Sequence, residues 1–106
     1  TYIPATGAVQ DMAAFSDDRE RIAFEIVQTR CAVCHAAVPT MEGFTAPPGG
    51  VLLETVGEML VAKDRIFTQV IATDIMPPGN MTEITDAERA QLGKWLAAVG
   101  AKEVVE

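Results

Sequence analysis

The chain has 106 residues, of which 49% are hydrophobic and 22% are charged, and its formal net charge at pH 7 is −7. This length suits one small domain, and the acidic balance excludes a typical nucleic-acid-binding surface, which is basic. The sequence contains no run of about 18 consecutive apolar residues, so it predicts no membrane-spanning helix.

The beginning of the chain predicts an arm followed by a helix. Residues 1–15 have no hydrophobic period and are interpreted as an arm or linker before a domain of residues 16–106. The first helix is expected to begin after an N-cap at Ser16, with acidic residues in its first turn, and to end near Arg30. Its apolar stripe consists of Ile22, Ala23, Ile26 and Val27. Together with the later helices, this pattern predicts an all-α fold.

A Cys-x-x-Cys-His motif follows this helix directly. It contains Cys31, Cys34 and His35, which are both cysteines and the only histidine of the chain. This spacing is the attachment signature of a c-type haem, in which two thiols form thioethers and the histidine binds the iron. A dithiol redox motif expects a βαβ setting, and a structural zinc site needs four ligands. A simple disulfide would leave His35 unexplained, so we expect one covalent haem c.

The rest of the chain predicts a long loop and two further helices. Proline and glycine are dense in residues 36–53, which are expected to form a loop around one edge of the haem. A helix is predicted from the capping box Thr55-Val-Gly-Glu58 to about Thr73, and residues 76–84 form a second loop. The last helix is expected to run from the capping box Thr85-Asp-Ala-Glu88 to about Val99, with Gly100 at its end. Its inward-facing residues are Leu92, Trp95, Leu96 and Val99.

The second axial position of the iron has methionine as its candidate ligand, because the chain has no other histidine. Of the five methionines, Met12 lies in the arm, Met41 is close in sequence to His35, and Met59 lies on an apolar helical stripe. The two remaining candidates, Met76 and Met81, lie in the loop before the last helix. Met76 is favoured because Pro77 and Pro78 stiffen the backbone beside it, and Met81 is the alternative. His/Met ligation raises the reduction potential.

These motifs together resemble those of class I cytochromes c over about residues 17–100. The resemblance implies a small fold of helices and loops around one covalent haem, in which the first and last helices cross. It places Ala23 and Val27 against Leu92 and Trp95 at this crossing. The chain departs from the family there, where members often have glycine and an aromatic residue. It departs again at Ala36, where glycine commonly follows the haem histidine.

The resemblance also implies residues around the haem. A proline carbonyl, here of Pro47 or Pro48, is expected to accept the N–H of the proximal histidine and to fix its ring. By residue type alone, the candidate partners of the haem propionates are Arg65, Arg89, Lys94 and Trp95. The expected function is one-electron transfer. A sensor or catalytic haem with an open distal site is the rival from another class, and it predicts that carbon monoxide binds readily.

A closer resemblance is to the C-terminal cytochrome c domain of bacterial membrane-bound urate oxidases. It rests on the phrases RCAVCHAAVPTMEGFTAPPGGVLLET, residues 30–55, and MPPGNMTEITDAERAQLGKWL, residues 76–96. It implies that the N-terminal membrane part of the parent oxidises urate and donates electrons to this haem. A cytochrome c or a terminal oxidase would accept them. It also implies a location on the periplasmic side, tethered to the inner membrane only through the parent. The chain lacks an initiator methionine and a leader, so we expect a mature protein or a domain of a longer one. A free-standing periplasmic shuttle is the alternative, and the isolated domain is expected to be a monomer.

Overall fold

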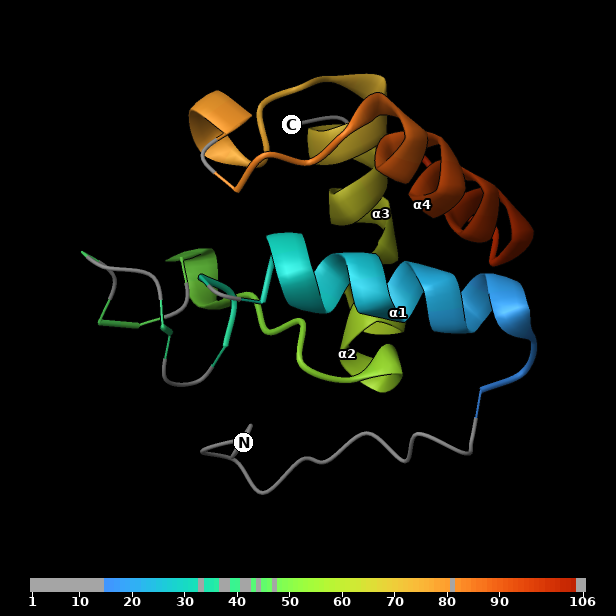
Figure 1. Cartoon of the computed structure of the whole chain (residues 1–106), viewed down its shortest axis with the longest axis horizontal. Helices are drawn as coiled ribbons and strands as arrows, with labels where there is room; N and C mark the ends of the chain where they lie inside the picture. The colour runs from blue at the N-terminus through green and yellow to red at the C-terminus, as the bar shows by residue number, and fades with distance from the viewer. Residues whose placement is uncertain are drawn as a thin grey trace.

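The computed structural model describes residues 15–32, 34–36, 39–40, 43, 45–46, 48–80 and 82–104. Four α-helices and three short helical turns occur there, and these described segments contain no strand. The helices are α1 (Asp18–Arg30), α2 (Val56–Val61), α3 (Lys63–Ile66) and α4 (Asp86–Ala98), and the turns are η1 (Pro48–Gly50), η2 (Phe67–Ala72) and η3 (Pro78–Asn80). Figure 1 shows α4 at an oblique angle to α1, with α3 between the two helices in this view. The predicted all-α class is confirmed.

Helix α1 begins one residue later than predicted. Its N-cap is Asp17, whose carboxylate accepts the backbone N–H of Glu20 at 2.9 Å. Ser16, the predicted cap, instead donates its backbone N–H to the Glu20 carboxylate at 3.0 Å. Both residue types are good caps, and the ionised carboxylate of Asp17 is the better partner for the positive end of the helix dipole. Residues 1–14 of the predicted arm lie outside the described residues, and the ring of Phe15 packs 5.3 Å from that of Phe24.

The predicted helix between residues 55 and 73 is interrupted. Thr55 is its N-cap, as expected, and accepts the N–H of Glu58 at 3.1 Å. The helix then breaks at Ala62, resumes as α3, and continues into η2 as a π-type turn. Thr68 takes part in this change of winding, because its hydroxyl donates to the carbonyl of Asp64 at 2.9 Å and accepts the N–H of Val104 at 2.7 Å. Such back-bonding by threonine bends helices.

Helix α4 has the capping predicted for it at both ends. The Thr85 hydroxyl accepts the N–H of Glu88, and the Glu88 carboxylate accepts the N–H of Thr85 at 2.8 Å. At the other end Gly100 has a φ of +75°, which glycine adopts without steric cost. The N–H of Ala101 then bonds to the Leu96 carbonyl at 2.9 Å, and the N–H of Gly100 bonds to that of Ala97 at 3.2 Å. These two bonds form a Schellman motif.

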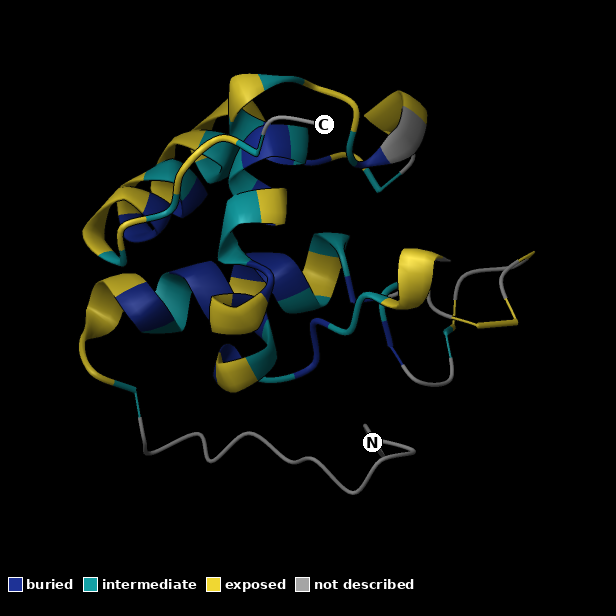
Figure 2. Ribbon diagram, turned by 180° about the vertical axis from the view of Figure 1, so that it is seen from behind, coloured by how far each residue is buried: buried dark blue, intermediate teal, exposed yellow. Residues whose placement is uncertain are grey.

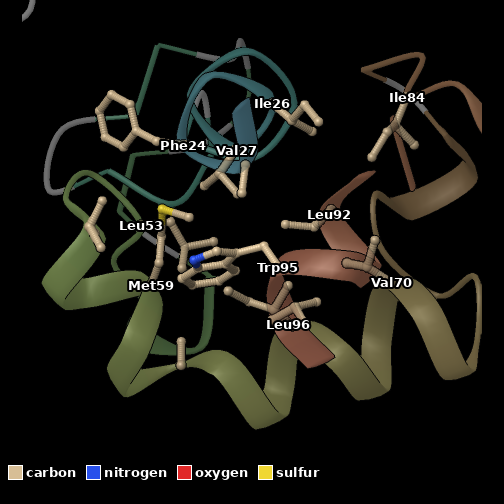
Figure 3. Packing of buried hydrophobic residues seen from close by; sticks show 14 residues of the cluster. Phe24, Ile26, Val27, Leu53, Met59, Val70, Ile84, Leu92, Trp95 and Leu96 are labelled. Atoms are coloured by element: carbon tan, nitrogen blue, oxygen red, sulfur yellow. The ribbon is translucent and has the colours of Figure 1, made fainter. Parts of the chain in front are cut away.

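The core lies where α1 and α4 cross, and these two helices make the most extensive contact between any two elements. Ala23 and Val27 of α1 and Leu92 of α4 are fully buried, and Trp95 is nearly so. Figure 3 shows Val27 pointing toward Leu92 and Trp95, as the sequence led us to expect. Buried residues face inward on both helices, and exposed residues cover their outer faces (Figure 2). This crossing sets the positions of the turn after α1 and of the loop before α4.

Candidate functional site

An apolar cleft of about 290 Å³ lies between the turn that follows α1 and the loop that precedes α4. Four separate parts of the chain contribute to it, and they lie far apart in the sequence. Most of the lining side chains are apolar, and the ionisable side chains are those of Arg65, His35 and one cysteine. The described lining comprises Val27, Cys31, His35, Gly49, Val51, Leu53, Arg65, Ile66, Gln69, Val70 and Met76. The cleft therefore brings together three residues that the sequence singled out: Cys31, His35 and Met76.

The two cysteines occupy a helical turn that continues from α1. The N–H of Cys31 bonds to the Val27 carbonyl at 2.8 Å, and the N–H of His35 bonds back to the Cys31 carbonyl at 3.0 Å. Cys31 lines the cleft, whereas Cys34 is buried and is not among the lining residues, and neither forms a disulfide. Burial raises the pKa of Cys31 to about 12 and raises that of Cys34 as well. Burial therefore disfavours the thiolate form of each group, whereas a reactive dithiol relies on a lowered pKa.

The ring of His35 is held by a backbone carbonyl. Its Nδ1 lies 3.0 Å from the carbonyl oxygen of Val51, and its own carbonyl accepts the N–H of Leu53 at 2.8 Å. A proton on Nδ1 leaves Nε2 as the ring nitrogen available to bind a metal. Burial lowers the pKa of His35, against the opposing effect of the Val51 bond, and thereby favours the neutral ring that metal ligation needs.

The carbonyl that holds His35 is not that of either proline expected for this role. Val51 comes three residues after Pro48 and directly follows η1, which spans Pro48–Gly50. Pro47 lies outside the described residues. Gly49 and Gly50 of η1 have φ values of +62° and +70°, so the backbone turns sharply there and brings Val51 alongside the histidine.

Met76 lies in the loop before α4 and lines the cleft together with the histidine. Its backbone N–H bonds to the Gln69 carbonyl at 2.9 Å, and its carbonyl accepts a bond from Arg89 at 3.3 Å. Met81, the alternative ligand, lies outside the described residues, as do Met12 and Met41. Met59 is completely buried in the core, where the sequence placed it.

The candidate polar partners of a cofactor lie in different places. Arg65 is exposed and lines the cleft, whereas Lys94 is exposed on α4. Arg89 uses its guanidinium on the carbonyls of Val70, at 2.6 Å, and Met76. Trp95 is not among the lining residues, and its indole nitrogen is buried without a hydrogen-bond partner in the described part of the chain. In Figure 3 this nitrogen faces Leu53 and Met59.

Sequence reasoning missed the contacts that join the two sides of the cleft. Arg30, directly before Cys31, donates to the Thr82 carbonyl at 2.7 Å, and the Thr82 hydroxyl donates back to the Arg30 carbonyl at 2.7 Å. The Arg30 guanidinium also pairs with Glu88 of α4 at 3.1 Å. No pattern in the sequence signals these bonds, because their partners are 52 and 58 residues away.

The donor set of the cleft fits a haem better than a bare metal ion. Imidazole and thioether are ligands of haem iron, and the Cys31 thiol on the cleft, with Cys34 three residues along the chain, has the spacing that attachment of two vinyl groups needs. In the described ranges, no group of three or more His, Cys, Asp and Glu side chains is placed to hold a metal ion. No helix in those ranges is long and apolar enough to cross a membrane. Comparison of the chain with protein-family models, curated proteins and solved structures gave no match.

Proposed function

We propose that this chain is a one-electron carrier with a single haem c attached through Cys31 and Cys34. His35 and Met76 are its axial ligands in this proposal. The observation that carries it is the apolar cleft, which Cys31 and His35 of the haem-attachment motif line together with Met76. An apolar, open cleft beside a motif of this spacing supports the proposal, because a planar apolar group needs such a surface to pack against.

The chain's own residues hold the ligands and shield the site. The haem, when bound, supplies the redox chemistry by changing its iron between the ferric and ferrous states. The Val51 carbonyl orients the His35 ring, and the bonds at Gln69 and Arg89 hold the Met76 backbone. If His35 and Met76 both bound the iron, they would leave no ligand position for dioxygen. Arg65, the exposed cation on the cleft, is the best-placed partner for a propionate.

The class I cytochrome c fold belongs to the same proposal. Its support is the order of the elements: α1 leads directly into the Cys-x-x-Cys-His turn, the Met76 loop precedes α4, and these two helices cross over the core. The described helices have the order that this family would require.

We further propose that the chain is the haem domain of a membrane-bound urate oxidase. The support is the sequence resemblance in residues 30–55 and 76–96. Urate oxidation in the membrane part would release two electrons, which would pass one at a time through this haem to a respiratory acceptor on the periplasmic side. In membranes that carry the full-length parent, urate should therefore reduce this haem, whereas the isolated chain should not respond to urate. If the chain is a free-standing shuttle, urate should reduce its haem neither in those membranes nor in the isolated chain.

Optical spectra of the haem-loaded protein test the ligation. We expect the wild type to have the weak red-region band of methionine-to-iron ligation in the ferric state and to resist carbon monoxide in the ferrous state. Met76→Ala should lose both properties, and Met81→Ala, the matched control from the same loop, should keep them. A wild type that is high-spin and binds carbon monoxide would replace this proposal with an open-site haem.

A further inference from the structure

Arg89 connects the first turn of α4 to the segment that carries Met76. A single nitrogen of its guanidinium, Nη1, donates to the Val70 carbonyl at 2.6 Å and to the Met76 carbonyl at 3.3 Å. Val70 belongs to η2, which ends at Ala72, so the arginine bonds a carbonyl near the end of this turn and another just beyond it. Its positive charge also suits the negative end of a helical segment.

These bonds leave Met76 with both backbone polar groups held. Its N–H is bound by the Gln69 carbonyl at 2.9 Å, and its C=O is bound by Arg89. Gln69, Val70 and Met76 all line the cleft. A residue whose backbone is fixed on both sides presents its side chain to a narrow region, here the cleft that His35 also lines.

We propose that Arg89 is the positioning residue for the Met76 sulfur. This inference rests on the proposed function, because the sulfur needs to be positioned only if it binds the haem iron. A thioether is an uncharged ligand, so its ligation depends on how well the loop is preorganised. Arg89 suits this role because a guanidinium makes charge-assisted hydrogen bonds, which are stronger than neutral ones. Its role is thus different from that of a propionate partner, which its residue type alone suggested.

Arg89→Leu tests the inference, with Lys94→Leu as the matched control. Leucine has a helix propensity similar to that of arginine and removes only the charge and the donors. Lys94→Leu removes the same charge from an exposed position of the same helix. Arg89→Lys restores a cation with donors, so we expect it to behave more like the wild type than Arg89→Leu does.

Amide hydrogen exchange on the haem-loaded variants gives the first readout. We expect Arg89→Leu to speed exchange at the Met76 amide by roughly 10-fold to 100-fold, the size of effect that a hydrogen bond to a charged group supports. Exchange at the amide of Val27 in α1 should not change. Equal acceleration at both amides would mean a general loss of stability and would overturn the inference, as would an unchanged rate at Met76.

The optical spectrum gives the second readout and separates the two proposals. We expect Arg89→Leu to weaken the methionine-to-iron band and to admit carbon monoxide, while Lys94→Leu does neither. A band that is equally strong in the wild type and in Arg89→Leu overturns the positioning role and leaves the proposed function intact. A wild type without the band overturns the proposed function, and the positioning role falls with it.

Discussion

Replacing Arg30 with leucine removes the only side chain that bonds both to the loop before α4 and to α4 itself among the described contacts. The Arg30 guanidinium donates to the Thr82 carbonyl at 2.7 Å and pairs with Glu88 at 3.1 Å, and its side chain is 25% exposed. A hydrogen bond from a charged donor contributes about 1.5 kcal/mol at this partial exposure. The ion pair adds about 0.5 kcal/mol.

We therefore expect Arg30→Leu to lower the free energy of unfolding by about 2 kcal/mol at pH 7. For a domain of this size the midpoint of thermal unfolding should fall by about 10 °C. The assay is denaturant unfolding followed by circular dichroism. Arg21→Leu is the control: Arg21 lies on the same helix and pairs with Glu25, but its side chain is 43% exposed, so its loss should change the stability by less than about 0.5 kcal/mol.

The pH dependence of this difference gives a sharper test. Hydrogen bonds from the Thr85 backbone and from Arg30 hold the pKa of Glu88 below its ordinary value of 4.5. A carboxyl whose pKa is lowered in the folded state stabilises the fold fully above its unfolded pKa, and this contribution is lost as the pH falls through the folded pKa. The destabilisation by Arg30→Leu should thus be largest near neutral pH and smaller near pH 3. A difference that is constant with pH, or no larger than that of Arg21→Leu, would refute this reasoning.

Three further predictions concern the helices. Met59→Ala should lower the free energy of unfolding by about 2–5 kcal/mol because Met59 is completely buried. Val61→Ala, at a site that is 91% exposed, should change it by less than about 0.5 kcal/mol. Similar losses for the two variants in thermal unfolding would contradict the assigned core. Thr85→Ala should cost about 1 kcal/mol through loss of the capping box, and an unchanged denaturant midpoint would argue against that cap. Gly100→Ala should lower the free energy of unfolding by about 1 kcal/mol because φ is +75° at this position, although the added methyl group would meet no neighbour. A gain in stability would contradict this backbone conformation.

Local signals in the sequence predicted the helix ends well. Thr55 and Thr85 cap the helices that they were expected to cap, and Gly100 ends α4, because capping depends on residues within one turn. The N-cap of α1 was one residue off because Ser16 and Asp17 are both good caps. The break at Ala62 was not predictable in this way, since residues 58–72 contain neither glycine nor proline.

The candidate site divides along the same line. The motif of Cys31, Cys34 and His35 could be recognised from the sequence because its residues lie within five positions. The two prolines after Met76 favoured that residue as the candidate iron ligand. The carbonyl that holds the histidine was expected from a proline, but it belongs to Val51, because the positive φ values of η1 decide which carbonyl faces the ring. The bonds of Arg89 to Val70 and Met76 span 19 and 13 residues, and only the packing of α4 against η2 reveals them.

The most direct test of the central claim is the mass of the intact chain measured after unfolding. The protein should be produced in a bacterial host that loads haem onto a control c-type cytochrome. We predict the mass of the chain plus one haem, retained through denaturation, and the mass of the bare chain for the double variant Cys31→Ala and Cys34→Ala. A wild-type chain that carries no added mass, in a host that loads the control, would contradict the assignment of a covalent haem.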